Sequence, residues 1–358
     1  MTYKKLGVIK LKDTLNSSSR IQAIDIVRGI TISLVVMGHT EMPPQLNNIF
    51  SAFRMPLFFM VSGYLLNVTK HSDNFSTFIQ TRIWRLLIPY FSAGILFYII
   101  WIIRQYYNQD YTLSWYEPII GIFYGNGEML YVNVPIWFLI CLFCSEVLFL
   151  AIMSLIQSYK NSLQLLIFIG IGFIGGYISY YVHLPWGLDI AFVVQLFLYI
   201  GNKFKSIGLF KCFHFPITFI IISTILFIIL NPINGLIDIN NRIYGNIILF
   251  YINGFLGSVI MLYAAQLLGN SKVFSKIFIY FGKNSINILI FHNATFWFLS
   301  MLNNTLHSPL LSHWFIYTIF GITMSLFISF IIKKYPLLQM LFNGVRQKNK
   351  KFLSNYKN

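Results

Sequence analysis

The sequence is poor in charged residues, and above all in acidic ones. Only 10% of its 358 residues are charged, with 10 Asp and Glu against 26 Lys and Arg, whereas 57% are hydrophobic. Because soluble globular domains carry about 25% charged residues, this composition excludes that class. The sequence predicts an all-α, polytopic membrane protein.

Cysteine is also scarce, with three residues in the whole chain. Cys141 and Cys144 lie three residues apart in one apolar run, so they do not indicate a disulfide framework. A metal site built on them would need further ligands nearby. We therefore expect no metal.

Apolar runs long enough to cross about 30 Å of hydrocarbon predict about ten membrane-spanning helices. The first run lacks a small-residue cleavage site and carries polar residues, so we interpret it as a retained span and not as a signal peptide. The sixth and seventh runs are the shortest. The predicted helices lie near residues 21–40, 49–67, 84–103, 135–155, 164–182, 188–201, 215–230, 245–268, 277–301 and 312–332.

The basic residues predict the orientation. With the N-terminus inside, all but four of the 26 Lys and Arg residues fall in or beside inner segments. This bias predicts that both termini are cytoplasmic. The chain then divides into a basic cytoplasmic segment (1–20), a transmembrane domain (21–334) and a basic cytoplasmic tail (335–358). The spread of charge over the inner loops favours membrane lipids as partners and argues against nucleic acid.

The first predicted helix carries Asp25, Arg28 and His39. Ionisable residues inside a membrane helix cost free energy, so they indicate a functional site. Arg28 and His39 are eleven residues apart, which is three turns plus about 20°; they therefore share a helix face and lie about 16 Å apart. The alternatives are a histidine that marks the interface and an ion pair of Arg28 with Asp25.

Two more residues are expected at the depth of His39, near the outer surface. The second helix brings Arg54 there, and the ninth brings His292. Arg54 is suited to stabilise a developing oxyanion, or alternatively to pair with Glu41. At the inner surface, Arg82 and Arg85 lie three residues apart and are suited to bind phosphates, although such a pair is also a common topology signal.

These residues carry a resemblance to a known family. Arg28 and His39, separated by ten residues, are similar to the signature of the acyltransferase-3 family of membrane acyltransferases, and the sequence resembles the fucose 4-O-acetylase-like group most. Arg82 and Arg85 match the family's Arg-x-x-Arg motif. One departure is Arg54, where relatives often have histidine before Met-Pro. The further matching segments are residues 55–59, 62–65, 135–139, 142–143 and 282–292.

The resemblance implies transfer of an acyl group, most often acetyl from acetyl-CoA, to a hydroxyl of an extracytoplasmic cell-envelope glycan or lipid-linked sugar. It implies His39 as general base, assisted by a catalytic set of Arg28, Asp25 and His292. Arg82, Arg85 and Arg28 would bind the cofactor. The residues assigned to the acceptor are Arg54, Glu41, Trp137 and Glu128.

Other readings of the sequence remain open. The same charges suit a transporter or exporter of a small polar solute or glycan, and a noncatalytic partner in envelope assembly is a further alternative. Trp137 and the outer segment 104–134, which holds Glu128, are equally typical of an aromatic belt at the interface. The richness in Ile, Lys and Asn suggests the cell membrane of a bacterium. The acceptor, the choice between acetyl and succinyl, and the oligomeric state are not specified.

Overall fold

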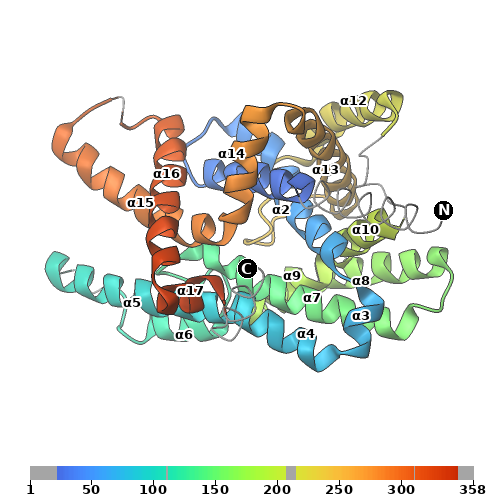
Figure 1. Cartoon of the computed structure of the whole chain (residues 1–358), viewed down its shortest axis with the longest axis horizontal. Helices are drawn as coiled ribbons and strands as arrows, with labels where there is room; N and C mark the ends of the chain where they lie inside the picture. The colour runs from blue at the N-terminus through green and yellow to red at the C-terminus, as the bar shows by residue number, and fades with distance from the viewer. Residues whose placement is uncertain (1–21, 110–111, 207–214, 310, 346–358) are drawn as a thin grey trace, which may run out of the picture.

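The computed structural model describes residues 22–109, 112–206, 215–309 and 311–345. Within these ranges the structure is helical, and its one β-element is an isolated antiparallel bridge between Asp238 and Ile243. The predicted all-α class is therefore confirmed (Figure 1). The predicted segment 1–20 and most of the tail 335–358 lie outside the described residues, so these boundaries stay predictions.

The first helix covers residues 22–38. The following elements are α2 (Pro44–Leu65), α3 (Val68–Asp73), α4 (Phe75–Arg82), η1 (Ile83–Leu87), α5 (Ile88–Asn108), α6 (Glu117–Tyr124), η2 (Val134–Ile136), α7 (Trp137–Ile156), α8 (Asn161–Tyr181), η3 (Pro185–Gly187), α9 (Leu188–Val193), α10 (Gln195–Ser206), α12 (Ile217–Asn234), α13 (Ile247–Gly269), α14 (Lys272–Lys283), α15 (Ser285–Leu306), α16 (Trp314–Lys334) and α17 (Pro336–Asn343).

Seven helical segments among the described residues are long and apolar enough to cross a membrane, and an eighth is added if the bent pair Pro185–Val193 and Gln195–Ser206 counts as one span. The two halves of that pair meet at 59°. The chain is thus a multi-pass membrane protein by the length and composition of its helices. The count of ten spans and the cytoplasmic termini stay predictions.

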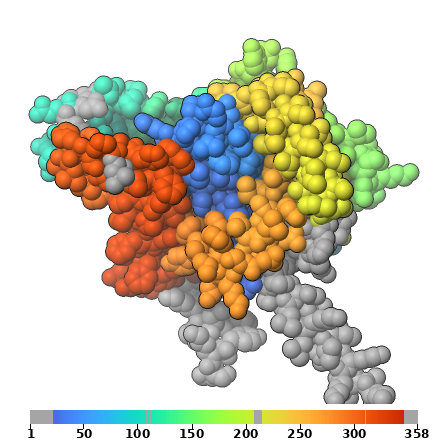
Figure 2. Space-filling view, turned by 90° about the horizontal axis from the view of Figure 1, so that it is seen from above, coloured from blue at the N-terminus to red at the C-terminus, as the bar shows by residue number. Residues whose placement is uncertain are grey.

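The first helix and α2 lie in the interior of the molecule. Val27, Val36, Leu57 and Phe59 are each 0% exposed. Figure 1 shows α2 between α4 to α7 on one side and α12 to α14 on the other, and Figure 2 shows these blue residues between α16 and α12. Because other helices shield them from lipid, these two helices accommodate polar residues that a lipid-facing span does not.

The segment predicted as one helix near residues 277–301 differs in the structure, where α14 ends at Lys283 and α15 begins at Ser285. Two glycines explain the path of α14. A Cβ atom at Gly29 would collide with the carbonyl oxygen of Phe278, and one at Gly282 would collide with that of Asp25. Only glycine therefore permits α14 to cross the first helix so closely, and the chain then turns before α15 begins.

One end of the bundle is rich in lysine, and we call it the basic end. Lys205 Nζ donates to the carbonyl oxygen of Leu66 (2.7 Å) after the end of α2, and Lys203 Nζ donates to Asn161 Oδ1 (2.7 Å) at the start of α8. Lys333 Nζ, near the end of α16, donates to Asn284 Oδ1 beside the start of α15. The opposite end holds the start of α2. The gathering of lysine residues at one end is the reason for predicting that this end faces the cytoplasm.

Candidate functional site

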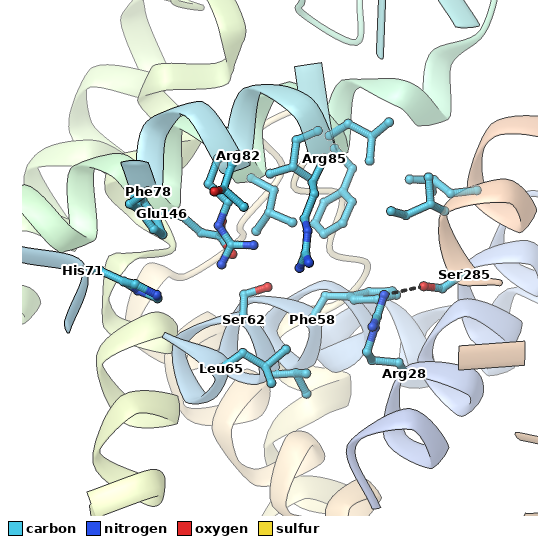
Figure 3. A pocket seen from close by; sticks show the side chains of 18 of the residues that line it. Arg28, Phe58, Ser62, Leu65, His71, Phe78, Arg82, Arg85, Glu146 and Ser285 are labelled. Atoms are coloured by element: carbon cyan, nitrogen blue, oxygen red, sulfur yellow. Dashed lines mark hydrogen bonds and ion pairs between the residues drawn. The ribbon is translucent and has the colours of Figure 1, made fainter. Parts of the chain in front are cut away.

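A cavity of about 620 Å³ opens at the basic end, between the first helix, α2, α3, α4, η1, α7 and the start of α15 (Figure 3). The ionisable side chains around it are mostly basic, with a single carboxylate. A concave site of one predominant sign attracts ligands of the opposite charge. These side chains are Arg28, Lys70, His71, Arg82, Arg85 and Glu146.

Arg28 reaches this cavity from the first helix. Its Nη2 donates to Ser285 Oγ over 2.8 Å, which holds the guanidinium against the start of α15. Asp25 is 8% exposed and does not line the cavity. No close ion pair joins Asp25 to Arg28 among the described residues, although the two charges attract each other over a longer distance. The catalytic role of Asp25 stays a prediction.

Arg82 and Arg85 have different environments although they are three residues apart. Arg82 ends α4, and its Nε lies 2.8 Å from Glu146 Oε2, with both side chains largely buried. Arg85 lies in η1, a π-helical turn. It is exposed, no ion pair or hydrogen bond to the described residues holds it, and its guanidinium points toward that of Arg28 (Figure 3). Arg85 is therefore free to bind an anion. A π turn within a helix is frequent at functional sites.

Sequence reasoning missed Glu146 and His71. Glu146 is 3% exposed and comes from α7, an otherwise apolar helix. A carboxylate within such a helix is itself a sign of a functional or paired group, so the signal was present in the sequence. His71 comes from the short helix α3, for which the sequence carried no comparable signal. Both residues line the cavity.

His39 and His292 are neighbours toward the end of the bundle opposite the basic end. Their ring centroids lie 5.1 Å apart, at 46° to each other. His39 is exposed, whereas His292 is 0% exposed. The Nδ1 atom of His292 lies 2.8 Å from the carbonyl oxygen of Ile288. Because a carbonyl only accepts, Nδ1 carries the proton and Nε2 carries a lone pair, for which the described residues provide no donor.

Arg54 adjoins this pair. Its Nη1 donates to Asn47 Oδ1 over 2.9 Å, and a Cβ atom at Gly38 would collide with its guanidinium. The side chain thus lies against the residue before His39. Glu41 is exposed, and no ion pair in the described structure joins it to Arg54. The structure therefore brings together His39, His292 and Arg54, while their chemical roles stay predictions.

Trp137 and Glu128 are the two other residues predicted to bind the acceptor. Trp137 is 6% exposed at the start of α7, with its ring centroid 6.2 Å from that of Phe138. Glu128 is exposed, and its Oε2 lies 2.9 Å from His183 Nδ1. Neither lines the cavity. Acceptor binding by these two residues stays a prediction.

A buried ion pair at the end of the bundle opposite the basic end was also not predicted from the sequence. Arg242 Nε and Asp189 Oδ2 lie 2.8 Å apart, with side-chain exposures of 3% and 0%. Nη1 of Arg242 also donates to Asn126 Oδ1 over 2.9 Å. One guanidinium thereby connects three segments that are far apart in the sequence. Arg242 has a backbone φ of 57°, in the left-handed region, which costs free energy outside glycine.

The cavity does not extend to His39. It reaches Ile32, one turn beyond Arg28 on the first helix. Val35 and Val36 follow, with exposures of 5% and 0%, and His39 is seven positions after Ile32. At 1.5 Å per residue this is about 10 Å along the helix axis. The two groups of polar residues are thus connected by one helix and separated by two turns of packed side chains.

No cluster of three or more His, Cys, Asp or Glu side chains suited to a metal occurs in the described ranges. A comparison with protein families gives one match, to the family described as an acyltransferase domain, over residues 21–334. No curated protein matches, and no solved structure does. Because the family match covers most of the chain, the protein belongs to the acyltransferase-3 family.

Proposed function

We propose that this protein is a membrane O-acyltransferase. It moves an acyl group, acetyl from acetyl-CoA, to a hydroxyl of an extracytoplasmic glycan or lipid-linked sugar, as its resemblance to the fucose 4-O-acetylase-like group implies. The supporting observation is that one interior helix carries Arg28 in a basic cavity and, eleven residues on, His39 beside His292.

The basic cavity suits the donor. CoA carries phosphate groups, and guanidinium groups bind phosphate through charge-assisted hydrogen bonds. Arg85 is without a partner among the described residues and faces Arg28, so an anion between them relieves their mutual repulsion. Arg82 is already paired with Glu146, so its role is to shape the cavity and add positive charge at longer range.

The group at the opposite end suits the chemistry. His39 accepts the proton of the acceptor hydroxyl as the hydroxyl oxygen attacks the thioester carbonyl carbon. The C–S bond then breaks, and the sulfur of CoA leaves and takes the proton from His39. General acid and base catalysis of this kind contributes about 10² to 10⁴ in rate. The nearby Arg54 stabilises the negative charge on the carbonyl oxygen.

The two ends must communicate during transfer. The acyl-bearing arm of CoA has to pass from Ile32 to His39, where the side chains of the first helix are packed. We expect Phe58 and Leu289, which line the cavity, to move when the donor binds. Such motions on the μs to ms scale commonly gate enzyme turnover.

We propose that the protein lies in the cell membrane of a bacterium, with its basic end facing the cytoplasm. Acetyl-CoA is then reached from inside, and the acceptor from outside. Membrane lipids surround the spans, and anionic lipids face the lysines of the basic end.

Comparing envelope glycans from cells with and without the protein tests this function. Mass spectrometry is expected to show a glycan that is heavier by one acyl unit only when the protein is present. Cells that carry His313→Asn serve as a control, because His313 caps α16 and belongs to neither group, and because Asn also caps helices. Unchanged glycan masses, together with uptake of a labelled polar solute into vesicles without acyl-CoA, would instead support a transporter.

A further inference from the structure

His71 lies at the far end of the cavity from Arg28. It comes from α3, which precedes the long span Phe75–Tyr107. Figure 3 shows Arg28 and Ser285 at one side of the cavity and His71 at the other, with Arg82 and Arg85 between them. The cavity therefore presents an imidazole ring, then guanidinium groups, in a row.

The His71 ring is supported from behind by a second ring. Its centroid lies 4.8 Å from that of Phe78, with the planes at 35°. Phe78 is only 5% exposed, and the Cζ of Arg82 lies 5.1 Å from its ring centroid. Arg82 and His71 thus both pack on the Phe78 ring. Phe78 also lines the cavity but is buried, so His71 is the ring with more surface open to a ligand.

The His71 ring is held neutral and in one tautomer. Burial lowers its pKa, and the positive charges of Arg82, Lys205 and Lys70 lower it further. The backbone N–H of Asn67 donates to Nδ1 over 3.4 Å, so the ring carries its proton on Nε2. A neutral ring with a free N–H donor is suited to stack on a heterocycle and to bind a ring nitrogen or a phosphate.

We propose that His71 is the stacking platform for the adenine of CoA. This proposal rests on the proposed function, which names acetyl-CoA as the donor. It specifies how the donor is oriented in the cavity. With the base on His71, the phosphates lie beside Arg82 and Arg85, and the pantetheine arm points to Arg28 and the first helix. Asn74 and Thr77, which line the same end, supply polar groups to the edge of the base.

Binding to the purified full-length protein tests this site without any need for turnover. The probes are adenosine 3′,5′-bisphosphate, which is the nucleotide end of CoA, and 4′-phosphopantetheine, which lacks the base. His71→Ala is expected to weaken nucleotide binding about tenfold, because stacking on an aromatic side chain contributes strongly to base binding. Binding of 4′-phosphopantetheine should stay within about twofold of the wild type.

His71→Phe is the conservative variant, because it keeps a ring and loses the N–H. It should retain nucleotide affinity within about threefold, whereas His71→Gln, which keeps polarity and loses the ring, should lose it as Ala does. If His71→Ala does not fold, the Phe and Gln pair gives the same comparison. Equal losses for both probes, or no loss for either, would overturn the proposal.

This result is separable from that for the proposed function. Ring-dependent nucleotide binding without any acyl transfer would support the adenine platform and refute the acyltransferase activity. Acyl transfer with a donor KM that is unchanged in His71→Ala would support the activity and refute the platform. Failure of the wild-type protein to bind the nucleotide would refute the platform directly.

Discussion

The two ends of the first helix hold the same kinds of side chain in different surroundings. At the basic end, Arg28 and Arg85 face each other across the cavity, and among the described residues Arg28 is hydrogen-bonded to Ser285 alone. At the opposite end, Arg54 is held by Asn47 against the backbone of Gly38, and the neighbouring His292 is fully buried. The first arrangement leaves charge available to a ligand, and the second fixes groups in place.

This difference indicates a division of labour. Free guanidinium groups around a cavity are suited to bind a diffusible anion, because the ligand supplies the missing negative charge. At the opposite end, the buried and hydrogen-bonded His292 lies beside the exposed His39, and such a positioned pair of imidazoles is suited to proton transfer. Substitutions at the two ends should therefore change different kinetic and physical quantities.

The largest effect is expected at His39. His39→Ala should lower kcat for acyl transfer about 10³-fold through loss of the general base, while the Kd for acetyl-CoA stays nearly unchanged. Release of the CoA thiol gives kcat, and calorimetry on the purified protein gives Kd. Full activity in this variant would show that His39 is not the base. A matching loss of donor affinity would show that the two ends are not functionally separate.

Arg82 and Arg85 divide the basic end itself. Arg82→Ala should lower the free energy of unfolding by about 3 to 5 kcal/mol, because it leaves the buried Glu146 carboxylate without its partner. Arg85→Ala should leave stability almost unchanged and raise the Kd for acetyl-CoA about tenfold to hundredfold. Thermal unfolding and donor binding measured on both variants separate these effects.

Glu146→Gln is the matched control for this pair. In the Arg82→Ala background it should restore much of the lost stability, since a neutral amide does not require a buried cation. If Arg82→Ala proved stable and Arg85→Ala unstable, the assignment of one structural and one ligand-binding arginine would be reversed.

The crossing of α14 over the first helix is a further point at which packing is expected to matter. Gly29→Ala or Gly282→Ala should destabilise the protein by about 1 to 3 kcal/mol, because the added Cβ meets a backbone carbonyl oxygen. Gly170→Ala in α8 is the control, since nothing lies within 4 Å of its added Cβ and Ala is the better helix former. A stable Gly282→Ala variant would argue against this close crossing.

The smallest effect is expected at His292. His292→Gln keeps an acceptor at about the position of Nε2 and should lower kcat less than His292→Asn, which places its polar group near Nδ1. A difference of about tenfold corresponds to one hydrogen bond. Measured kcat values in the reverse order would show that the Nδ1 side of the ring carries the function.

Much of the fold follows from local sequence features. The apolar runs predicted the helices, and the spacing of Arg28 and His39 on one helix required only helical geometry. The division into α14 and α15 was not predictable in this way, because it depends on close contacts between residues far apart in the sequence, Gly29 with Phe278 and Gly282 with Asp25. The bend between α9 and α10 likewise could not be predicted from the local sequence.

The site was predictable only in part for the same reason. Arg82 and Glu146 are 64 positions apart in the sequence, and their pairing depends on α4 packing near α7. Pro89 lies four residues after Arg85 and lacks the N–H that would bond to the Arg85 carbonyl oxygen, so the π turn at Arg85 does have a sequence signal, which the prediction did not use. By contrast, the polar residues of the first helix were evident at once, because ionisable groups are conspicuous in an apolar run.

A structure of the protein with bound CoA would show where the donor lies, and it needs no acceptor. We expect the phosphates of CoA within hydrogen-bond distance of Arg85, and the thiol end on the His39 side of Arg28. A CoA molecule bound outside the basic cavity, or one whose thiol points from Arg85 away from the first helix, would contradict this expectation.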